Sequence, residues 1–239
     1  MVFAAGLGTR LKPLTDTRPK ALVEIGGRPL IKHVLDKLVA AGFNRIVVNV
    51  HHFANMVEEW IKSHPYTGVD ISISDESEML LDTGGGLKKA APLFDDNAPI
   101  LIHNVDILSN IDFKKLYETH ADSDATLVVS KRKTSRYLLF NDEMRLTGWT
   151  NVNTGEVKSP HENLNPNDFK MLAFSGIHVF SPKLFKEMNG FTNKFGIIDF
   201  YLKTCADLII KGYEKTDLRL MDVGKIDTID EAGKFLNEM

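Results

Sequence analysis

The sequence predicts a single α/β domain with a Rossmann-like, mostly parallel mixed sheet and helices on both faces. Short apolar, β-branched runs alternate along the chain with stretches of helical periodicity, which is typical of parallel strands joined by helices. The chain has 239 residues, of which 43% are hydrophobic and 26% charged. This size and composition suit one globular core that spans residues 1–239.

The first half of the chain establishes the alternation of strands and helices. An apolar run from Val2 to Ala5 ends at Gly6 and predicts a buried strand. The elements predicted next are a helix from about Pro29 that stops at Gly42, a strand at 45–50, a helix at 53–63, a strand at 69–74, a helix at 86–93, a strand at 100–103, a helix at 113–120 and a strand at 125–130. Glycine and proline mark several of these boundaries.

In the second half the pattern changes between residues 131 and 170, which we interpret as a subregion of the same domain. Residues 137–149 predict a hairpin, and 152–166, rich in Asn, Gly and Pro, predict a loop or lid beside the carboxyl edge of the sheet. A strand at 171–180, helices from Pro182 and from about Ile197, a strand near 218–221 and a helix at 228–237 complete the prediction. The single cysteine, Cys205, lies in a helical pattern at 200–212 and is expected to be a core residue.

Charge and hydropathy exclude several classes of function. The net charge is −3 and no long Lys/Arg block is present, so nucleic acid is not an expected partner. No apolar run approaches the ~18 residues that span a membrane, and no secretory leader pattern opens the chain. We expect a cytoplasmic protein.

The N-terminal stretch carries the clearest chemistry. Closely spaced glycines after a strand let backbone N–H groups approach an anion, Arg10 can fork two phosphate oxygens, and Lys20 adds a point charge. The residues predicted to bind a nucleotide here are Ala4, Ala5, Gly6, Gly8, Thr9, Arg10 and Lys20. No Gly-Lys-Ser/Thr follows, and Leu11 replaces the third glycine of a dinucleotide fingerprint. A plain tight turn is the alternative, which Pro13 and Pro19 together with the two basic residues disfavour.

The stretch Gly6 to Lys20 resembles the signature loop of the sugar-1-phosphate nucleotidyltransferases. Similarity continues at 81–86, which resembles the second nucleotide loop of that family, at 102–107, its metal strand, at 174–179, its sugar-binding strand, and at 221–224, its second acidic turn. The resemblance implies the nucleotide-diphospho-sugar transferase fold. It also implies transfer of a nucleotidyl group from an NTP to a sugar 1-phosphate, with release of pyrophosphate.

The resemblance also assigns site residues. Asp106 and Asp222 each follow an apolar strand and are expected to hold Mg²⁺; a helix cap or turn is the alternative, and Val105 stands where relatives usually have glycine. Asp82, Thr83, Gly84 and Gly85 are expected at the nucleotide, unless the glycines form a flexible linker. Glu78 and Asp82 either accept from a guanine edge or are solvated. Asn104, Gly148, Ser175, Gly176 and Asp199 are expected at the sugar. The family's Glu-Lys-Pro lysine has no clear equivalent, and Lys158 is interpreted as a solvated loop residue.

In the implied reaction Arg10, Lys20 and Asp106 are the catalytic residues. The short single-domain form is most similar to the N-acetylmuramate 1-phosphate uridylyltransferases, which use UTP; GTP with mannose 1-phosphate is the alternative. A catalytically silent paralogue that binds nucleotide sugars is a further hypothesis. A glycosyltransferase is disfavoured because Asp106 is followed by Ile and Leu instead of completing an Asp-x-Asp motif. The oligomeric state stays open, with a homodimer as one option.

Overall fold

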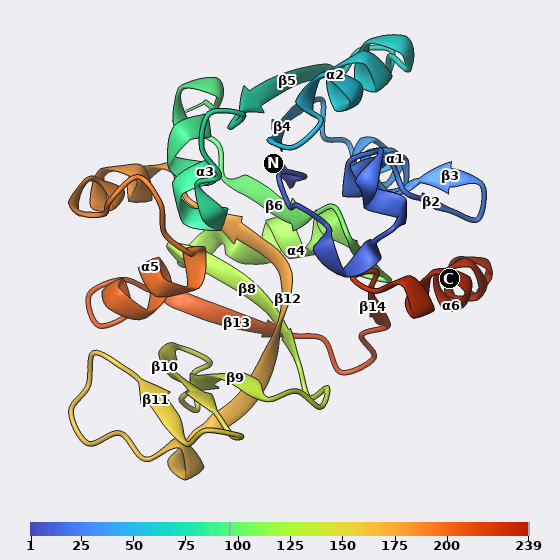
Figure 1. The fold of residues 1–239 in the computed structure, drawn as a ribbon. Helices are drawn as coiled ribbons and strands as arrows, with labels where there is room; N and C mark the ends of the chain where they lie inside the picture. Colours follow the sequence, from blue (N-terminus) through green and yellow to red (C-terminus); the bar gives the residue numbers. More distant parts are fainter. Residues whose placement is uncertain (96, 239) are drawn as a thin grey trace.

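A computed structural model of the chain describes residues 1–95 and 97–238. It is built around a ten-stranded sheet (Figure 1). Eight strands follow the order β11-β10-β9-β12-β6-β1-β4-β5, β8 pairs with β12, and β13 pairs with β8. The strands are β1 (Val2–Phe3), β4 (Arg45–Val50), β5 (Asp70–Asp75), β6 (Ile100–Asn104), β8 (Ala125–Ser130), β9 (Arg136–Phe140), β10 (Leu146–Asn151), β11 (Glu156–Lys158), β12 (Lys170–Phe180) and β13 (Ile210–Glu214). β1 pairs in parallel with β4 and β6, whereas β12 is antiparallel to β6, β8 and β9. The predicted mixed α/β sheet is confirmed.

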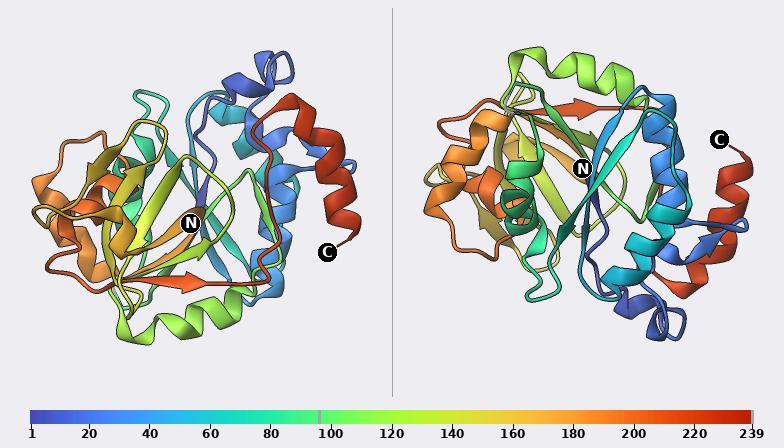
Figure 2. Two further views of the ribbon diagram at one scale, coloured as in Figure 1. Left: turned by 90° about the horizontal axis from the view of Figure 1, so that it is seen from below. Right: turned by 90° about the horizontal axis from the view of Figure 1, so that it is seen from above.

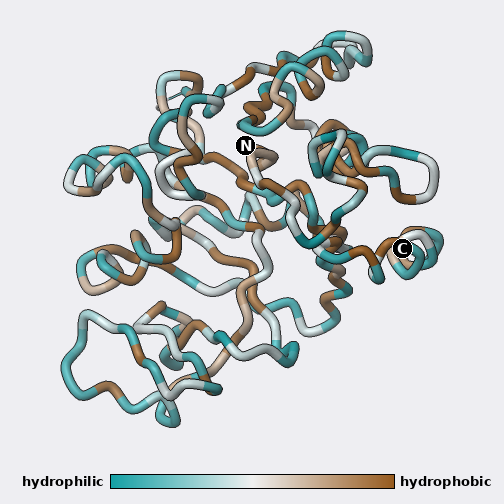
Figure 3. Tube along the Cα trace, viewed as in Figure 1, coloured by the Kyte–Doolittle hydropathy of each residue, from teal (hydrophilic) through white to brown (hydrophobic). Residues whose placement is uncertain are grey.

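Helices cover both faces of the sheet (Figure 2). The first core contains the apolar sides of α1 (Leu30–Ala40), α2 (Ala54–Ser63), α4 (Phe113–Thr119) and α6 (Ile229–Asn237), and the second contains those of α3 (Asp82–Ala90) and α5 (Ile197–Thr204). Neighbouring strand residues alternate between the two cores: Val2 packs in the first and Phe3 in the second. The central strands are accordingly the most hydrophobic part of the chain trace (Figure 3).

Two small antiparallel pairs stand outside the main sheet. One joins β2 (Glu24–Ile25) to β3 (Arg28–Pro29), and the other joins β7 (Ile107–Ser109) to β14 (Leu220–Asp222). Short 3-10 helices lie at Thr9–Leu11, Leu14–Asp16, Lys20–Leu22, Ala91–Leu93, His120–Asp122, Pro166–Asp168, Pro182–Gly190 and Ile226–Thr228. The β7–β14 pair was not expected from the sequence, and it brings the C-terminal part of the chain beside Asp106.

Several local predictions are wrong. The helix expected at 86–93 begins at Asp82, and the helical pattern at 200–212 ends at Thr204, after which 210–214 forms β13. β13 adds to the edge of β8 as a parallel strand, and this pairing decides its conformation. The expected loop at 152–166 contains β11. Cys205 is buried, as predicted, and burial raises the pKa of its thiol to about 11. No helix within 1–95 and 97–238 is both long and apolar enough to cross a membrane.

Candidate active site

The N-terminal loop leaves β1 at the middle of the sheet's carboxyl edge, because β1 lies between β4 and β6. Gly8 adopts a φ of 64°, in the left-handed region that favours glycine. A Cβ on Gly8 would stand 2.8 Å from Thr15 Cγ2, and the Thr15 hydroxyl donates to the Gly8 carbonyl at 2.8 Å. The loop is therefore folded back on itself and held by Thr15.

Gly6 is different, because a Cβ there would meet no atom within 4 Å. The packing of the protein does not demand glycine at this exposed position, which leaves open space beside the backbone. Arg10 reaches across to the C-terminal acidic turn: its Nη2 lies 2.8 Å from where a Cβ on Gly224 would stand. The loop thus presents an accessible backbone at one end and a guanidinium at the other.

Lys20 forms an ion pair with Asp106. Lys20 is only 7% exposed, so the Asp106 carboxylate compensates the charge of a nearly buried ammonium. Asp106 follows β6, and its carbonyl oxygen accepts from the backbone N–H of Val223 at 2.8 Å. This bond ties the first acidic turn to the second.

Asp222 lies opposite Ile107 in the β7–β14 pair, next to Asp106. Burial raises the pKa of Asp222, and the negative charge of Asp106 raises it further, while Lys20, Arg10 and Arg132 act in the opposite direction. Two carboxylates that repel each other at the end of a sheet are suited to a divalent cation. The described residues contain no cluster of three or more metal-ligating side chains, so further ligands would come from substrate oxygens and water.

These elements surround one cleft of about 390 Å³. Of the residues predicted to bind ligands, those that line it are Ala4, Gly6, Gly8, Thr9, Arg10, Lys20, Thr83, Asn104 and Asp106. The lining also includes Leu7, Leu80, Val105 and Gly224. The structure therefore brings together the N-terminal loop, the first acidic turn and part of the second glycine-rich loop.

The glycines of that second loop, expected before a helix, lie inside the first turns of α3. The N–H groups of Gly84 and Gly85 both donate to the Phe195 carbonyl, at 2.9 and 3.2 Å. A Cβ on Gly85 would stand 2.1 Å from the Asn193 carbonyl oxygen. Close packing against the segment before α5 accounts for these glycines and excludes a flexible linker. Because their N–H groups are engaged, nucleotide binding by Asp82, Gly84 and Gly85 stays a prediction.

Of the residues predicted to bind the sugar, one lines the cleft and the other four lie outside its lining. Gly176, with a φ of 72° at a register shift in β12, packs against Asn104: a Cβ there would lie 2.7 Å from Asn104 Nδ2. Ser175 is 1% exposed, Gly148 packs against the Lys158 carbonyl, and the Asp199 carboxylate folds back toward Gly196. Only Asn104 of these lines the cleft. The sugar contacts of all five residues stay predictions.

The cations near the residues predicted to bind the sugar differ from the expected pattern. Lys158 lies 5.2 Å from the centre of the Trp149 ring and 3.7 Å from a Glu156 carboxylate oxygen, which agrees with its interpretation as a loop lysine. Arg132, which sequence reasoning missed, donates to the Phe174 carbonyl at 2.9 Å and is among the cations that lower the pKa of Asp222. The available signal was the basic run 131–133 directly after a predicted strand.

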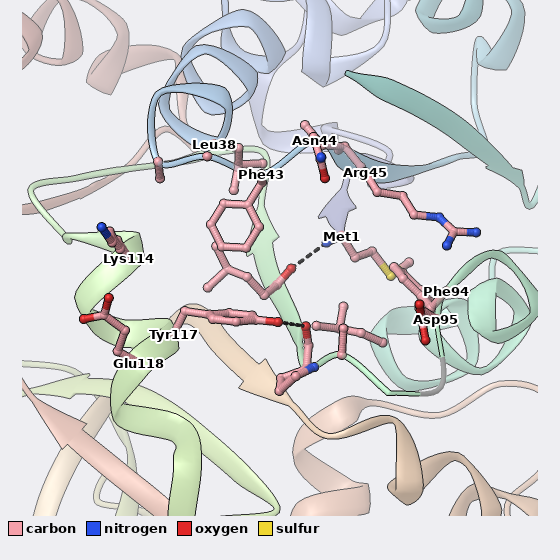
Figure 4. A pocket seen from close by; sticks show the side chains of 17 residues that line it. Met1, Leu38, Phe43, Asn44, Arg45, Phe94, Asp95, Lys114, Tyr117 and Glu118 are labelled. Carbon is pink, nitrogen blue, oxygen red and sulfur yellow. Dashed lines mark hydrogen bonds between the residues drawn. The ribbon is translucent and has the colours of Figure 1, made fainter. Parts of the chain in front are cut away.

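A second cavity of about 410 Å³ lies at the opposite, amino edge of the strands (Figure 4). Its walls include Met1, Phe43, Phe94 and Tyr117, and the α-amino group of Met1 donates to the Leu101 carbonyl. Burial lowers the pKa of that amine to about 5. No acidic pair or glycine-rich loop predicted to bind ligands lines this cavity among the described residues, so the smaller cleft at the carboxyl edge is the candidate active site.

Comparisons with known proteins show the family to which the chain belongs. A family model described as "Nucleotidyl transferase" matches residues 1–239. The N-acetylmuramate alpha-1-phosphate uridylyltransferase of Caulobacter vibrioides is 34% identical over 216 residues, which cover 87% of this chain and 84% of that protein. A mannose-1-phosphate guanyltransferase of Hypocrea jecorina is 38% identical over 135 residues, or 55% of this chain and 37% of that protein.

The fold is shared with solved structures. That of a UDP-glucose pyrophosphorylase from Acinetobacter baumanii is similar, with a TM-score of 0.79, at 16% identity and with 97% of this chain and 90% of that chain covered. With the matched family model, these relatives confirm the resemblance that the N-terminal loop indicated. The chain belongs to the nucleotidyl transferase family, as a sugar-1-phosphate nucleotidyltransferase.

Proposed function

We propose that the chain transfers the uridylyl group of UTP to N-acetylmuramate 1-phosphate, giving UDP-N-acetylmuramate and pyrophosphate. The observation that carries the catalytic part is the convergence of Arg10, Lys20, Asp106 and Asp222 at the carboxyl edge of the sheet, where open α/β sheets bind ligands. The open space beside Gly6 supports the approach of a triphosphate to the backbone of the N-terminal loop.

The chemistry follows from these charges. An oxygen of the sugar 1-phosphate attacks the α-phosphorus of the NTP in line, the new P–O bond forms as the bond to pyrophosphate breaks, and the departing anion carries the electron pair. The nucleophile is already an anion, so no general base is required. Arg10 and Lys20 align and neutralise the phosphates, which leaves positioning and electrostatics as the main sources of rate.

A divalent metal ion is generally used by this family, and we propose Mg²⁺. The Asp106 and Asp222 carboxylates fit such an ion, because they are hard oxygen ligands whose mutual repulsion a dication would relieve. Bound there, Mg²⁺ would supply charge neutralisation to the triphosphate.

The choice of substrates rests on the relatives. Similarity to the uridylyltransferase extends over most of both proteins, whereas similarity to the guanyltransferase is confined to a shorter shared segment. GTP with mannose 1-phosphate is the second candidate, supported by the higher identity within that segment. The two candidates differ in both base and sugar, so one experiment can separate them.

The test is pyrophosphate release with Mg²⁺ across the four common NTPs and the 1-phosphates of N-acetylmuramate, mannose, glucose and N-acetylglucosamine. We expect the largest signal for UTP with N-acetylmuramate 1-phosphate. A signal only for GTP with mannose 1-phosphate would replace the first candidate by the second. Nucleotide binding without turnover on any sugar 1-phosphate would instead favour a silent nucleotide-sugar-binding protein.

A further inference from the structure

A buried carboxylate lies between the two loops at the cleft. Glu76, directly after β5, is 1% exposed. One of its oxygens accepts from Asn49 Nδ2 at 2.6 Å, and the other accepts from the backbone N–H of Leu81 at 3.1 Å. Burial raises the pKa of Glu76, and these two bonds oppose that rise. A buried carboxylate is costly unless it is hydrogen-bonded, so this one calls for an explanation.

Asn49 continues the chain of hydrogen bonds in the other direction. It lies in β4, is 3% exposed, and its Oδ1 accepts from the backbone N–H of Ala4 at 2.7 Å. Ala4 opens the N-terminal loop and lines the cleft, while Leu81 follows Leu80, which lines the cleft from the other side. Asn49 and Glu76 therefore connect the backbones of the two loops through a continuous, buried path.

The position of Glu76 is fixed from several directions. Its backbone N–H donates to the Val50 carbonyl at 2.7 Å, and its own carbonyl accepts from His51 Nδ1 at 2.7 Å. A Cβ on Gly86 would stand 2.5 Å from Glu76 Oε1 and 3.0 Å from Asn49 Nδ2. Helix α3 thus packs directly on the Asn49–Glu76 pair, and a shift of the pair would move the helix.

The order of donors and acceptors along this path is strict. Both of its ends are backbone N–H donors, so the two side chains between them must present an acceptor at each end and one donor in the middle. One amide and one carboxylate meet this condition. Two amides would set two donors against each other, and two carboxylates would set two acceptors against each other.

From this geometry we infer that Glu76, acting through Asn49, is a positioning residue that fixes the distance between the two loops and thereby sets the affinity for the nucleotide. This inference rests on the proposed nucleotidyl transfer. The pair touches neither the acidic turns nor the sugar side in the contacts described above. Its role therefore concerns nucleotide binding more than the chemical step or the sugar 1-phosphate.

The test compares Glu76→Gln, Asn49→Asp and the double variant, all nearly isosteric with the wild type. We expect Glu76→Gln to weaken UTP binding about tenfold, because the donor–donor clash it creates is costly and is relieved when the two loops move apart. Asn49→Asp should weaken it similarly. The double variant has again one amide and one carboxylate, and should bind within about twofold of the wild type.

Binding is measured by titration calorimetry with UTP and Mg²⁺ in the absence of a sugar 1-phosphate, so the result does not depend on turnover. Unfolding midpoints are recorded in parallel. Asp124→Asn is the matched control, because Asp124 is also buried and accepts from a backbone N–H, that of Ile209 at 2.7 Å, but lies away from the cleft. It should lower the midpoint and leave UTP affinity unchanged.

Four outcomes would overturn the inference. If Glu76→Gln lowers the midpoint but binds UTP as tightly as the wild type, the pair is only structural. If the double variant stays as weak as the single variants, the donor order is wrong. If the wild type binds neither UTP nor GTP, the proposed function itself fails and the inference with it; binding by the wild type with no effect of the variants defeats the inference alone.

Discussion

Two parts of the molecule, the predicted nucleotide side (the N-terminal loop and residues 76–86) and the predicted sugar side (residues 174–178 of β12), differ in how their buried polar groups are satisfied. On the nucleotide side, Asn49 and Glu76 have hydrogen-bond partners within the protein. Beneath the sugar side, the buried Ser175 hydroxyl, both ring nitrogens of His178 and the Tyr201 hydroxyl have none among the described residues. Such groups are costly when unpaired. The difference indicates that hydrogen bonds within the protein hold the predicted nucleotide loops in place, whereas the polar side chains beneath the predicted sugar strand add no such bonds among the described residues.

We expect the largest effect from removal of the Asp106 charge, which both sides of the cleft share. Asp106→Asn should reduce kcat by about 10³-fold, because the variant loses a metal ligand and leaves Lys20 without its carboxylate. The unfolding midpoint should fall as well, because the nearly buried Lys20 ammonium loses the carboxylate that compensates its charge. Pyrophosphate release and thermal unfolding measure the two quantities. Asp112→Asn, a helix-capping site on α4, is the control and should keep full activity; equal activity in Asp106→Asn would refute the metal site.

A charge on the sugar side should act on one substrate only. Arg132→Gln is expected to raise the KM for the sugar 1-phosphate about tenfold, the usual effect of losing a charge-assisted hydrogen bond, while the KM for the NTP stays constant. Steady-state kinetics with each substrate varied in turn provides the test, with the neighbouring exposed Lys133→Gln as control. A rise in the KM for the NTP instead would break the division between the two sides.

The packing of the nucleotide side should appear in stability. Gly85→Ala places a Cβ 2.1 Å from the Asn193 carbonyl oxygen, and such overpacking costs roughly 1–3 kcal/mol. Gly233→Ala in α6, where a Cβ meets nothing within 4 Å, should stabilise the protein by about 0.5–1 kcal/mol. Urea unfolding separates the two, and a stable Gly85→Ala variant would show that the loop before α5 yields.

The smallest effect at neutral pH is expected at His178, whose buried ring nitrogens have no hydrogen-bond partner among the described residues. Burial lowers the pKa of His178 to about 3, from about 6.5 in the unfolded chain. As the pH falls, the unfolded chain therefore takes up a proton at His178 before the folded chain does. The stabilising contribution of neutral His178 is fully present above pH 6.5 and is lost as the pH falls from there toward 3. His178→Leu should reduce the number of protons taken up on unfolding in acid by about one. It should change the free energy of unfolding at pH 7 by less than about 1 kcal/mol. An unchanged acid slope would show that His178 does not stay neutral.

Sequence periodicity was sufficient for much of the fold. The strands at 45–50 and 125–130 and the helices α1 and α2 were predicted closely, because each is a continuous amphipathic or apolar run with a clear stop signal. Helix α3 was placed too late, since three glycines argue against a helix until contacts with Phe195 and Glu76 are known. The sequence at 210–212 continues a helical pattern, and the residues form β13 instead because of a tertiary contact, the pairing with β8.

The site divides in the same way. Arg10, Lys20 and Asp106 belong to contiguous motifs and could be predicted from the sequence, and the structure places all three at the cleft. Glu76 and Arg132 act through partners far away in the chain, Asn49 and Phe174. The basic run 131–133 marks Arg132 in the sequence, but no local pattern identifies the partner of either residue, so the folded chain is needed to find it.

The antiparallel pair of β7 and β14 has a consequence for the order in which the protein is made. β7 emerges with Asp106 in the first half of synthesis, but Asp222 is supplied by β14, close to the end of the chain. Until β14 has been synthesised, the N-terminal loop and Asp106 therefore lack the second carboxylate. Because domains fold as units, the proposed cation site would be completed only when β14 pairs with β7. Metal binding would then be a late sign of correct assembly.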